Sequence, residues 1–153
     1  MQNFTKSQTR LAFIQFIFQS EFLKSATPLS IEDFLNYFYN SNISSIDDKK
    51  EFRLKFNKNF LIKLSENYQK NLDKKTLIKN LNDKIEISRK FEKWDSLLQS
   101  LIFAIISELK ITDHKKIKIV FNDYLNISKS LVSVKETNLI NAIVQKYLLE
   151  YEK

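Results

Sequence analysis

The sequence that decides the fold is Asp95-Ser96-Leu97-Leu98-Gln99-Ser100-Leu101-Ile102-Phe103-Ala104-Ile105-Ile106-Ser107-Glu108-Leu109. Asp95 stands where a helix N-cap is expected. Apolar residues follow it at helical spacing: Leu97, Leu98, Leu101, Ile102, Ile105, Ile106 and Leu109. A helix with so broad an apolar face is expected to be the central, buried helix of the fold.

Helical spacing continues on the carboxy-terminal side of this segment. One helix is predicted after Asp113, and another after the capping box Ser133-Val134-Lys135-Glu136. The inner face of the first holds Ile117, Phe121, Tyr124, Leu125 and Ile127. The inner face of the second holds Leu139, Ile140, Ile143, Val144, Tyr147 and Leu148.

The amino-terminal part of the chain is also predicted to be helical. A first helix is expected from about Lys6 to Leu23, and a second from the cap at Ser30 to Asn40. A third, capped within Ser45-Ile46-Asp47-Asp48, carries apolar residues every four positions: Phe52, Phe56, Phe60, Leu64 and Tyr68. A weaker helical pattern between Asn71 and Lys90 involves Leu77, Ile78, Leu81 and Ile85.

Composition points to the same fold class. The chain has 153 residues with no glycine and a single proline, Pro28. Tight hairpin turns usually need glycine, whereas asparagine can supply the left-handed residue that ends many helices. We therefore expect one all-α domain over residues 1–153, a compact bundle of six or seven helices.

Composition and motifs exclude several classes of protein. There is no cysteine, so no disulfide or thiolate metal site is possible. No phosphate-binding glycine loop exists, and the single histidine, His114, is expected in a surface turn. The acidic pairs Glu32-Asp33 and Asp47-Asp48 lie at predicted helix starts, where negative charge interacts favourably with the helix dipole, so they need no catalytic explanation. We expect no catalysis, cofactor or metal. No long apolar run is present, so we expect no membrane span and no signal peptide, and we expect the protein in the cytoplasm.

Charge is concentrated in the middle of the chain. The formal net charge is +7, and the stretch from Lys49 to Lys93 holds 14 basic and 6 acidic residues. Such a stretch can attract nucleic acid, although a run of charge more often marks a solvated, lysine-rich surface.

Two segments resemble the NusB family of bacterial transcription antitermination factors, most closely its alphaproteobacterial members. The first runs from Lys6 to Gln19, where Arg10, Gln15 and Phe18 fit the family's opening helix. The second comprises residues 118–129 and 139–143, in which Asn122, Asp123, Lys129 and Asn141 fall on motif positions in order. Between them, Ser107-Glu108-Leu109 resembles the end of the family's central helix.

The resemblance implies a fold of two helical subdomains and a role in RNA binding. It implies binding to the boxA element of nascent ribosomal RNA together with the ribosomal protein NusE, within an antitermination complex on RNA polymerase. We expect phosphate contacts from Lys6 and Arg10, which lie one helical turn apart, and from Lys118 and Lys129. Phe18, at the family's tyrosine position, can stack on a base or pack in the core. Asn122 and Asn141 are expected to bond main chain between the last two helices.

The chain departs from the family pattern in ways that leave alternatives open. Ser7 occupies an arginine position, Phe103 replaces an arginine of the central helix, and leucines replace aromatic residues at Leu131 and Leu139. One alternative is a NusB-like adaptor that has lost RNA binding. Another is a NusB-like RNA-recruiting module that serves a separate RNA methyltransferase.

Overall fold

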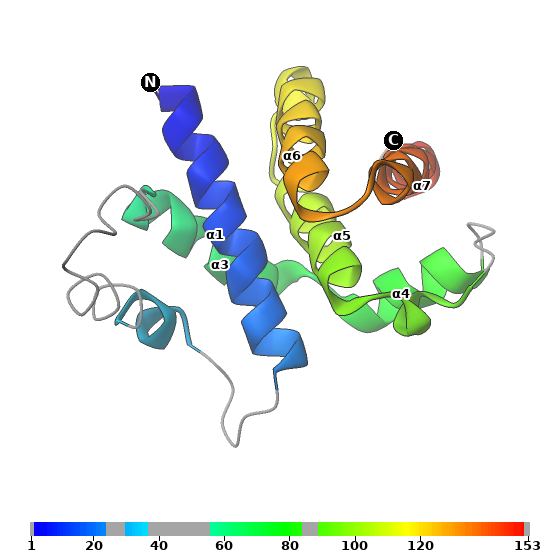
Figure 1. Ribbon diagram of the computed structural model, residues 1–153, viewed down its shortest axis with the longest axis horizontal. Helices are drawn as coiled ribbons and strands as arrows, with labels where there is room; N and C mark the ends of the chain where they lie inside the picture. The colour runs from blue at the N-terminus through cyan, green and yellow to red at the C-terminus, as the bar shows by residue number, and fades with distance from the viewer. Residues whose placement is uncertain (1, 24–29, 37–55, 84–88, 152–153) are drawn as a thin grey trace. The chain divides into compact units, whose positions relative to one another are not determined.

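The computed structural model describes residues 2–23, 30–36, 56–83 and 89–151, and every regular element in these ranges is a helix (Figure 1). The all-α prediction is confirmed. The elements, apart from a helical segment at residues 31–36, are α1 (Gln2–Phe22), α3 (Lys58–Asn71), α4 (Lys74–Asp83), η2 (Phe91–Lys93), α5 (Ser96–Leu109), η3 (His114–Lys116), α6 (Ile117–Leu131) and α7 (Val134–Tyr151).

The chain divides into two compact units, Met1–Ser65 and Glu66–Lys153, so the expected division into two helical subdomains is present. The boundary falls inside α3. Some predictions concern residues outside the described ranges: the end of the second helix near Asn40, the cap within residues 45–48, and the packing of Phe52 and Ile85.

In the first unit, side chains of α1 hold the two segments that follow it. The ring of Phe16 meets that of Phe34 edge to face, with centroids 5.5 Å apart, which ties α1 to the helical residues 31–36. The backbone N–H of Asn57 donates to Oγ1 of Thr9 at 2.8 Å, which ties α1 to the start of α3. Phe16 and Phe34 are fully buried, so this contact belongs to the core of the unit.

The start of α3 differs from the prediction. Phe56 and Asn57 are not helical, and the helix begins at Lys58. Asn57 caps it, because its Oδ1 accepts the backbone N–H of Phe60 at 2.9 Å. The four-residue spacing of Phe56 and Phe60 therefore does not mark one continuous helix, since α3 begins between them, after its capping residue Asn57.

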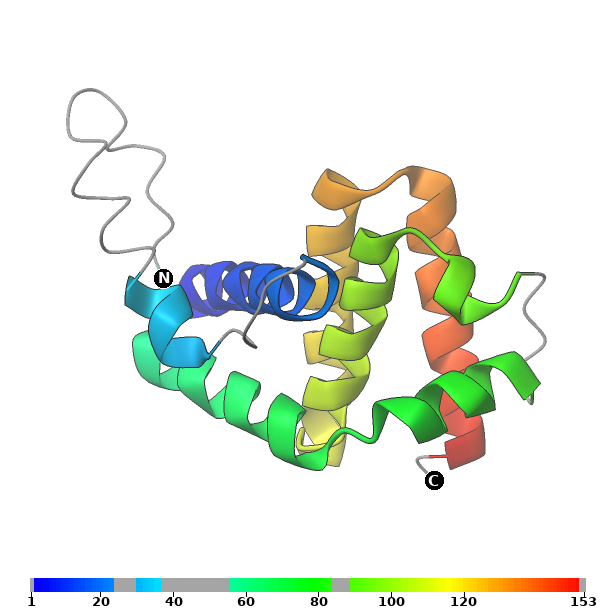
Figure 2. The same cartoon turned by 90° about the horizontal axis from the view of Figure 1, so that it is seen from below.

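In the second unit, α5 is the buried helix that the sequence predicts. All twelve of its residues from Leu98 to Leu109 are buried. It contacts both α6 and α7, which also contact each other, and Figure 2 shows α6 and α7 lying beside it. Phe103, which the resemblance to the NusB family sets at an arginine position, packs against Phe91 at 5.5 Å and Tyr68 at 6.4 Å between ring centroids.

The polar side chains of α5 are hydrogen-bonded. Gln99 donates to the carbonyl of Trp94 at 2.9 Å, and Ser100 donates to that of Ser96 at 2.9 Å. Asn67 of α3 donates to Ser107 Oγ at 3.2 Å and to the Ser107 carbonyl at 2.9 Å. Tyr124 Oη donates to Glu108 Oε1 at 2.6 Å. These bonds allow a helix with polar residues to be buried, because buried polar groups without partners are costly.

Some of the helices begin with a capping side chain and others do not. The predicted capping box is confirmed, since the N–H of Glu136 donates to Ser133 Oγ and the N–H of Ser133 donates to Glu136 Oε1. Ser30 Oγ likewise accepts the N–H of Asp33 at 3.0 Å. Asp95 and Asp113 stand at the N-cap positions of α5 and η3 but make no side-chain cap bond. The helix expected directly after Asp113 is preceded by η3, and α6 begins at Ile117.

Asp73, which the sequence analysis did not single out, caps α4. Its carboxylate accepts the hydroxyl of Thr76 at 2.8 Å and the N–H of Thr76 at 3.2 Å. The hydrogen bond from the Thr76 hydroxyl lowers the pKa of the Asp73 carboxyl most, and the bond from the Thr76 N–H lowers it further.

Helix ends are made without left-handed residues. No residue in the described ranges has a positive φ, so the expected asparagine caps are not used there. The helix α6 is instead followed by Val132, whose backbone is extended. At the end of α5, the Ile111 N–H and the Thr112 hydroxyl both donate to the Glu108 carbonyl. Helices without glycine thus end here in an extended residue or a tightened last turn.

Replacing Tyr124 by Phe is expected to lower the free energy of unfolding by about 1–3 kcal/mol, because buried Glu108 loses a hydrogen-bond donor. Urea denaturation measures the change. Ser128→Ala is the control, because its buried hydroxyl donates to a main-chain carbonyl, that of Tyr124, inside α6. A loss for Tyr124→Phe no larger than that for Ser128→Ala would contradict the importance of the Tyr124–Glu108 bond.

Replacing Ser133 by Ala is expected to cost about 1 kcal/mol of stability, because the N–H of Glu136 at the start of α7 loses its capping acceptor. Ser130→Ala removes an exposed hydroxyl bonded near the end of α6 and should change stability less. Equal effects of the two changes on the denaturation midpoint would argue against the cap.

Candidate nucleic-acid interface

The two cations predicted on α1 lie in different surroundings. Lys6 is exposed, whereas Arg10 is 7% exposed, and its guanidinium lies 5.6 Å from the centroid of the Phe60 ring. A guanidinium held over an aromatic face is not turned towards solvent. The expectation that both side chains reach a phosphate backbone is therefore not met by Arg10, which packs within its own unit.

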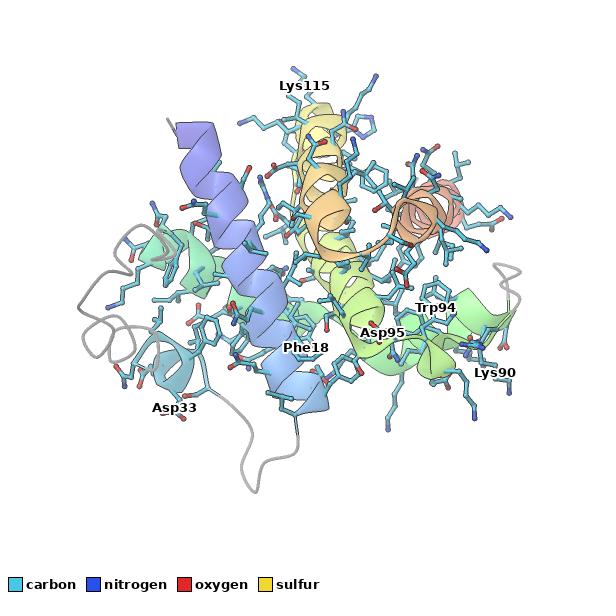
Figure 3. All side chains as sticks on the ribbon, viewed as in Figure 1. Phe18, Asp33, Lys90, Trp94, Asp95 and Lys115 are labelled. Atoms are coloured by element: carbon cyan, nitrogen blue, oxygen red, sulfur yellow. The ribbon has the colours of Figure 1, made fainter. Side chains whose placement is uncertain are left out.

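Phe18 and Gln15 keep part of their surface in solvent. Phe18 is half-buried on α1, and its ring centroid lies 6.2 Å from that of Phe22 (Figure 3). Gln15 is exposed. Phe18 thus belongs to an aromatic pair with accessible surface, which fits both of the roles considered for it.

One face of α6 carries a polar stripe made of Lys118, Asn122, Asn126 and Lys129. These residues are spaced by four, four and three positions, so they lie along one side of the helix. All four are exposed. The stripe extends about 16 Å along the helix axis. The predicted cations Lys118 and Lys129 are therefore at opposite ends of one accessible surface.

Further lysines stand where α6 begins. Lys115 and Lys116 of η3 are exposed and directly precede α6, and Figure 3 labels Lys115 at that end. With Lys118 they form a cluster of cations at a helix start, where positive charge opposes the helix dipole. Lys115 and Lys116 were not predicted as site residues, although they lie close to Lys118 in the sequence.

A groove lies between α6 and α7. Its volume is about 470 Å³, and it is lined by Asn122, Leu125, Asn126, Lys129, Thr137, Asn138 and Asn141. Asn122, Lys129 and Asn141, which the motifs place in two separate segments, therefore meet at one surface. Asp123 is half-buried and is not among the lining residues.

The asparagines of this groove do not have the bonds expected for them. Asn141 Oδ1 accepts Gln145 Nε2 at 2.7 Å within α7, and the Asn122 side chain has no hydrogen bond in the described part of the chain. The bonds to main chain between the last two helices are therefore absent among the described residues. Instead, these side chains line the groove. Asn126, Thr137 and Asn138 were not predicted as site residues, although each lies three or four positions from a predicted asparagine.

Leu131 and Leu139, which the resemblance sets at aromatic positions, keep part of their surface in solvent on α6 and α7. Leu131 is half-buried and Leu139 is 39% exposed. Leu139 and Ile140 were both expected on the inner face of α7, and of the two only Ile140 is buried. Residues next to each other on a helix point about 100° apart, so α7 turns one of the two outward.

The described ranges were compared with the requirements of a metal site. They contain no cluster of three or more histidine, cysteine or acidic side chains able to hold a metal ion. His114 is exposed in η3. No helix in these ranges is both long and apolar enough to cross a bilayer.

Comparisons with profiles of known protein families, with curated proteins and with solved structures find no significant match to this chain.

Arg10→Ala is expected to lower the free energy of unfolding by roughly 0.5–2 kcal/mol, because the Arg10–Phe60 contact is lost. Lys6→Ala removes the same charge from an exposed position and should change stability by less than about 0.5 kcal/mol. Thermal and urea denaturation compare the two. If both variants are as stable as the parent chain, Arg10 does not pack as described.

Proposed function

We propose that this chain is a non-catalytic RNA-binding protein of the NusB type. In this proposal it binds single-stranded boxA-type RNA jointly with the ribosomal protein NusE and supports transcription antitermination. The observation that carries the proposal is the groove between α6 and α7, because motif residues from two separate segments, Asn122 and Lys129 of one and Asn141 of the other, line it together.

The chemistry of this surface suits an unpaired strand. Lys118 and Lys129 are exposed at the two ends of the stripe and can neutralise phosphates, which supplies most of the affinity for nucleic acid. Asparagine amides between them offer donors and acceptors to base edges. Bases in single-stranded RNA are accessible for such contacts, whereas those of a duplex are paired.

The proposed binding to protein partners is supported by the resemblance to the NusB family. Binding to NusE and assembly on RNA polymerase are what the family likeness of residues 6–19, 118–129 and 139–143 implies. The cytoplasm follows as the site of such a function.

A second candidate is an adaptor that keeps the fold without RNA binding. The burial of Arg10 favours it, because with Ser7 at an arginine position only Lys6 of the predicted amino-terminal cations is exposed. In that case NusE binds and RNA does not.

The deciding experiment measures binding of a short single-stranded boxA-type RNA over a series of salt concentrations, with and without NusE. Lys118→Ala with Lys129→Ala should weaken binding and reduce the slope of log affinity against log salt by about two, one for each lost phosphate contact. NusE should tighten the binding of RNA to the parent chain.

Lys75→Ala with Lys79→Ala on α4 provides the control, because it removes two exposed lysines from the basic middle of the chain. If the α4 double variant reduces the slope of log affinity against log salt and the α6 double variant does not, RNA does not bind to α6. No RNA binding at low salt with NusE still bound would select the adaptor.

A further inference from the structure

Exposed cations from the basic middle of the chain gather in the second unit where α4 meets η2. Lys75 and Lys79 lie on the side of α4 that also carries Asn82, since the three residues are spaced by four and three positions. Asn82 bonds to η2, so this side of α4 adjoins η2 in the fold. The exposed cations of α4 and of the turn around η2 form the α4–η2 surface: Lys75, Lys79, Arg89, Lys90 and Lys93.

The backbone that carries the cations of residues 89–93 is held in place by hydrogen bonds and buried rings. Trp94 Nε1 donates to the Arg89 carbonyl at 3.0 Å, and the N–H of Phe91 donates to Asn82 Oδ1 at 2.8 Å. The rings of Phe91 and Trp94 are buried, with centroids 5.1 Å apart, and Figure 3 labels Trp94 in this part of the unit. The cations therefore project from a backbone of fixed shape, which lowers the entropic cost of binding a partner.

Positive charge is in excess around the α4–η2 surface. Between residues 70 and 95, the described positions hold seven lysine and arginine residues and four carboxylates, which are Asp73, Asp83, Glu92 and Asp95. Asp73 and Glu92 already accept hydrogen bonds, from the Thr76 hydroxyl and from Asn82 Nδ2. The surface therefore favours an anionic partner.

The groups that the α4–η2 surface offers to a partner are its charges. The apolar side chains beneath it are buried, as Leu77, Leu81, Phe91 and Trp94 show. The amide on this side of α4, that of Asn82, uses both its oxygen and its nitrogen in bonds to η2. Proteins hold single-stranded RNA by stacking its bases on exposed rings and by bonding base edges, so this surface differs from the α6 stripe, where asparagine amides lie between the lysines.

A partner recognised by charge on a regular lattice fits such a surface best. Anionic membranes and protein partners are bound through apolar side chains as well as through charge. A double helix instead presents paired bases and a backbone with roughly one negative charge per 1.7 Å of its axis, and lysines that neutralise its phosphates gain affinity by releasing counterions.

We infer that the α4–η2 surface binds the phosphate backbone of a double-stranded nucleic acid without reading its bases. Lys75 and Lys79 contact the backbone from α4, and Lys90 and Lys93 contact it from η2. The inference concerns a surface separate from that of α6 and α7, and it depends neither on boxA RNA nor on NusE.

The test measures binding of the full-length chain to a blunt RNA duplex of about 20 base pairs, roughly two helical turns, over a series of salt concentrations. The parent chain should bind the duplex, and its affinity should not change when the base sequence is changed. Lys90→Gln with Lys93→Gln should weaken binding and reduce the slope of log affinity against log salt by about two, one for each lost phosphate contact. Lys75→Gln with Lys79→Gln should have the same effect.

Lys135→Gln with Lys146→Gln is the matched control, because it removes two exposed lysines from α7 and lowers the net charge equally. It should leave the slope for the duplex unchanged. An equal effect of this control, a preference for one base sequence, or no duplex binding at low salt would overturn the inference. Binding to phosphatidylserine vesicles that depends on Lys90 and Lys93, without duplex binding, would also overturn it.

A DNA duplex of the same length identifies the source of the backbone. Equal affinities for the two duplexes show that any double helix is bound, and tighter binding of the RNA duplex identifies a base-paired segment of RNA. Both results support the inference.

Failure of the inference and failure of the proposed function are distinguishable. If single-stranded RNA binds through Lys118 and Lys129 but no duplex binds, the inference fails and the proposed function stands. If the duplex binds through Lys90 and Lys93 but no single-stranded RNA binds with or without NusE, the proposed function fails and the inference stands.

Discussion

Burial of α5 on all sides is the constraint on which the rest of the second unit depends. An unbroken run of buried residues from Leu98 to Leu109 requires other elements to cover every face of the helix. The contacts of α5 with α6 and α7, and those of Phe103 with Phe91 and Tyr68, provide that cover. Its polar residues are compatible with burial because each finds a partner, as Glu108 does in Tyr124.

Covering α5 decides which surfaces α6 and α7 leave for function. Both helices turn their apolar sides inward, with Tyr124 and Ile140 fully buried. The opposite side of α6 then carries Lys118, Asn122, Asn126 and Lys129 to solvent, and the meeting of α6 with α7 forms the groove. The fold thus builds a polar surface from residues whose spacing is fixed by helix periodicity. The same helix packing that forms the core also positions the candidate site.

The sequence predicts the helices and their caps well where periodicity and capping chemistry act locally. The buried α5, the box at Ser133 and Glu136, and the exposure of Lys129 follow from short-range patterns. The burial of Arg10 over Phe60 does not, because it depends on residues fifty positions apart. For the same reason, periodicity alone does not show that Thr137 and Asn138 face Asn122 and Asn126. That arrangement arises from the packing of two helices.

The most direct test of the account is to map where RNA contacts the chain. Single-stranded RNA containing a photoreactive nucleotide is cross-linked to the full-length protein, and the modified peptides are identified by mass spectrometry. The account predicts cross-links in the peptides of α6 and the first half of α7, reduced when unlabelled RNA competes. Cross-links confined to other helices, or insensitive to competing RNA, would contradict the claim that α6 and α7 form an RNA-binding surface.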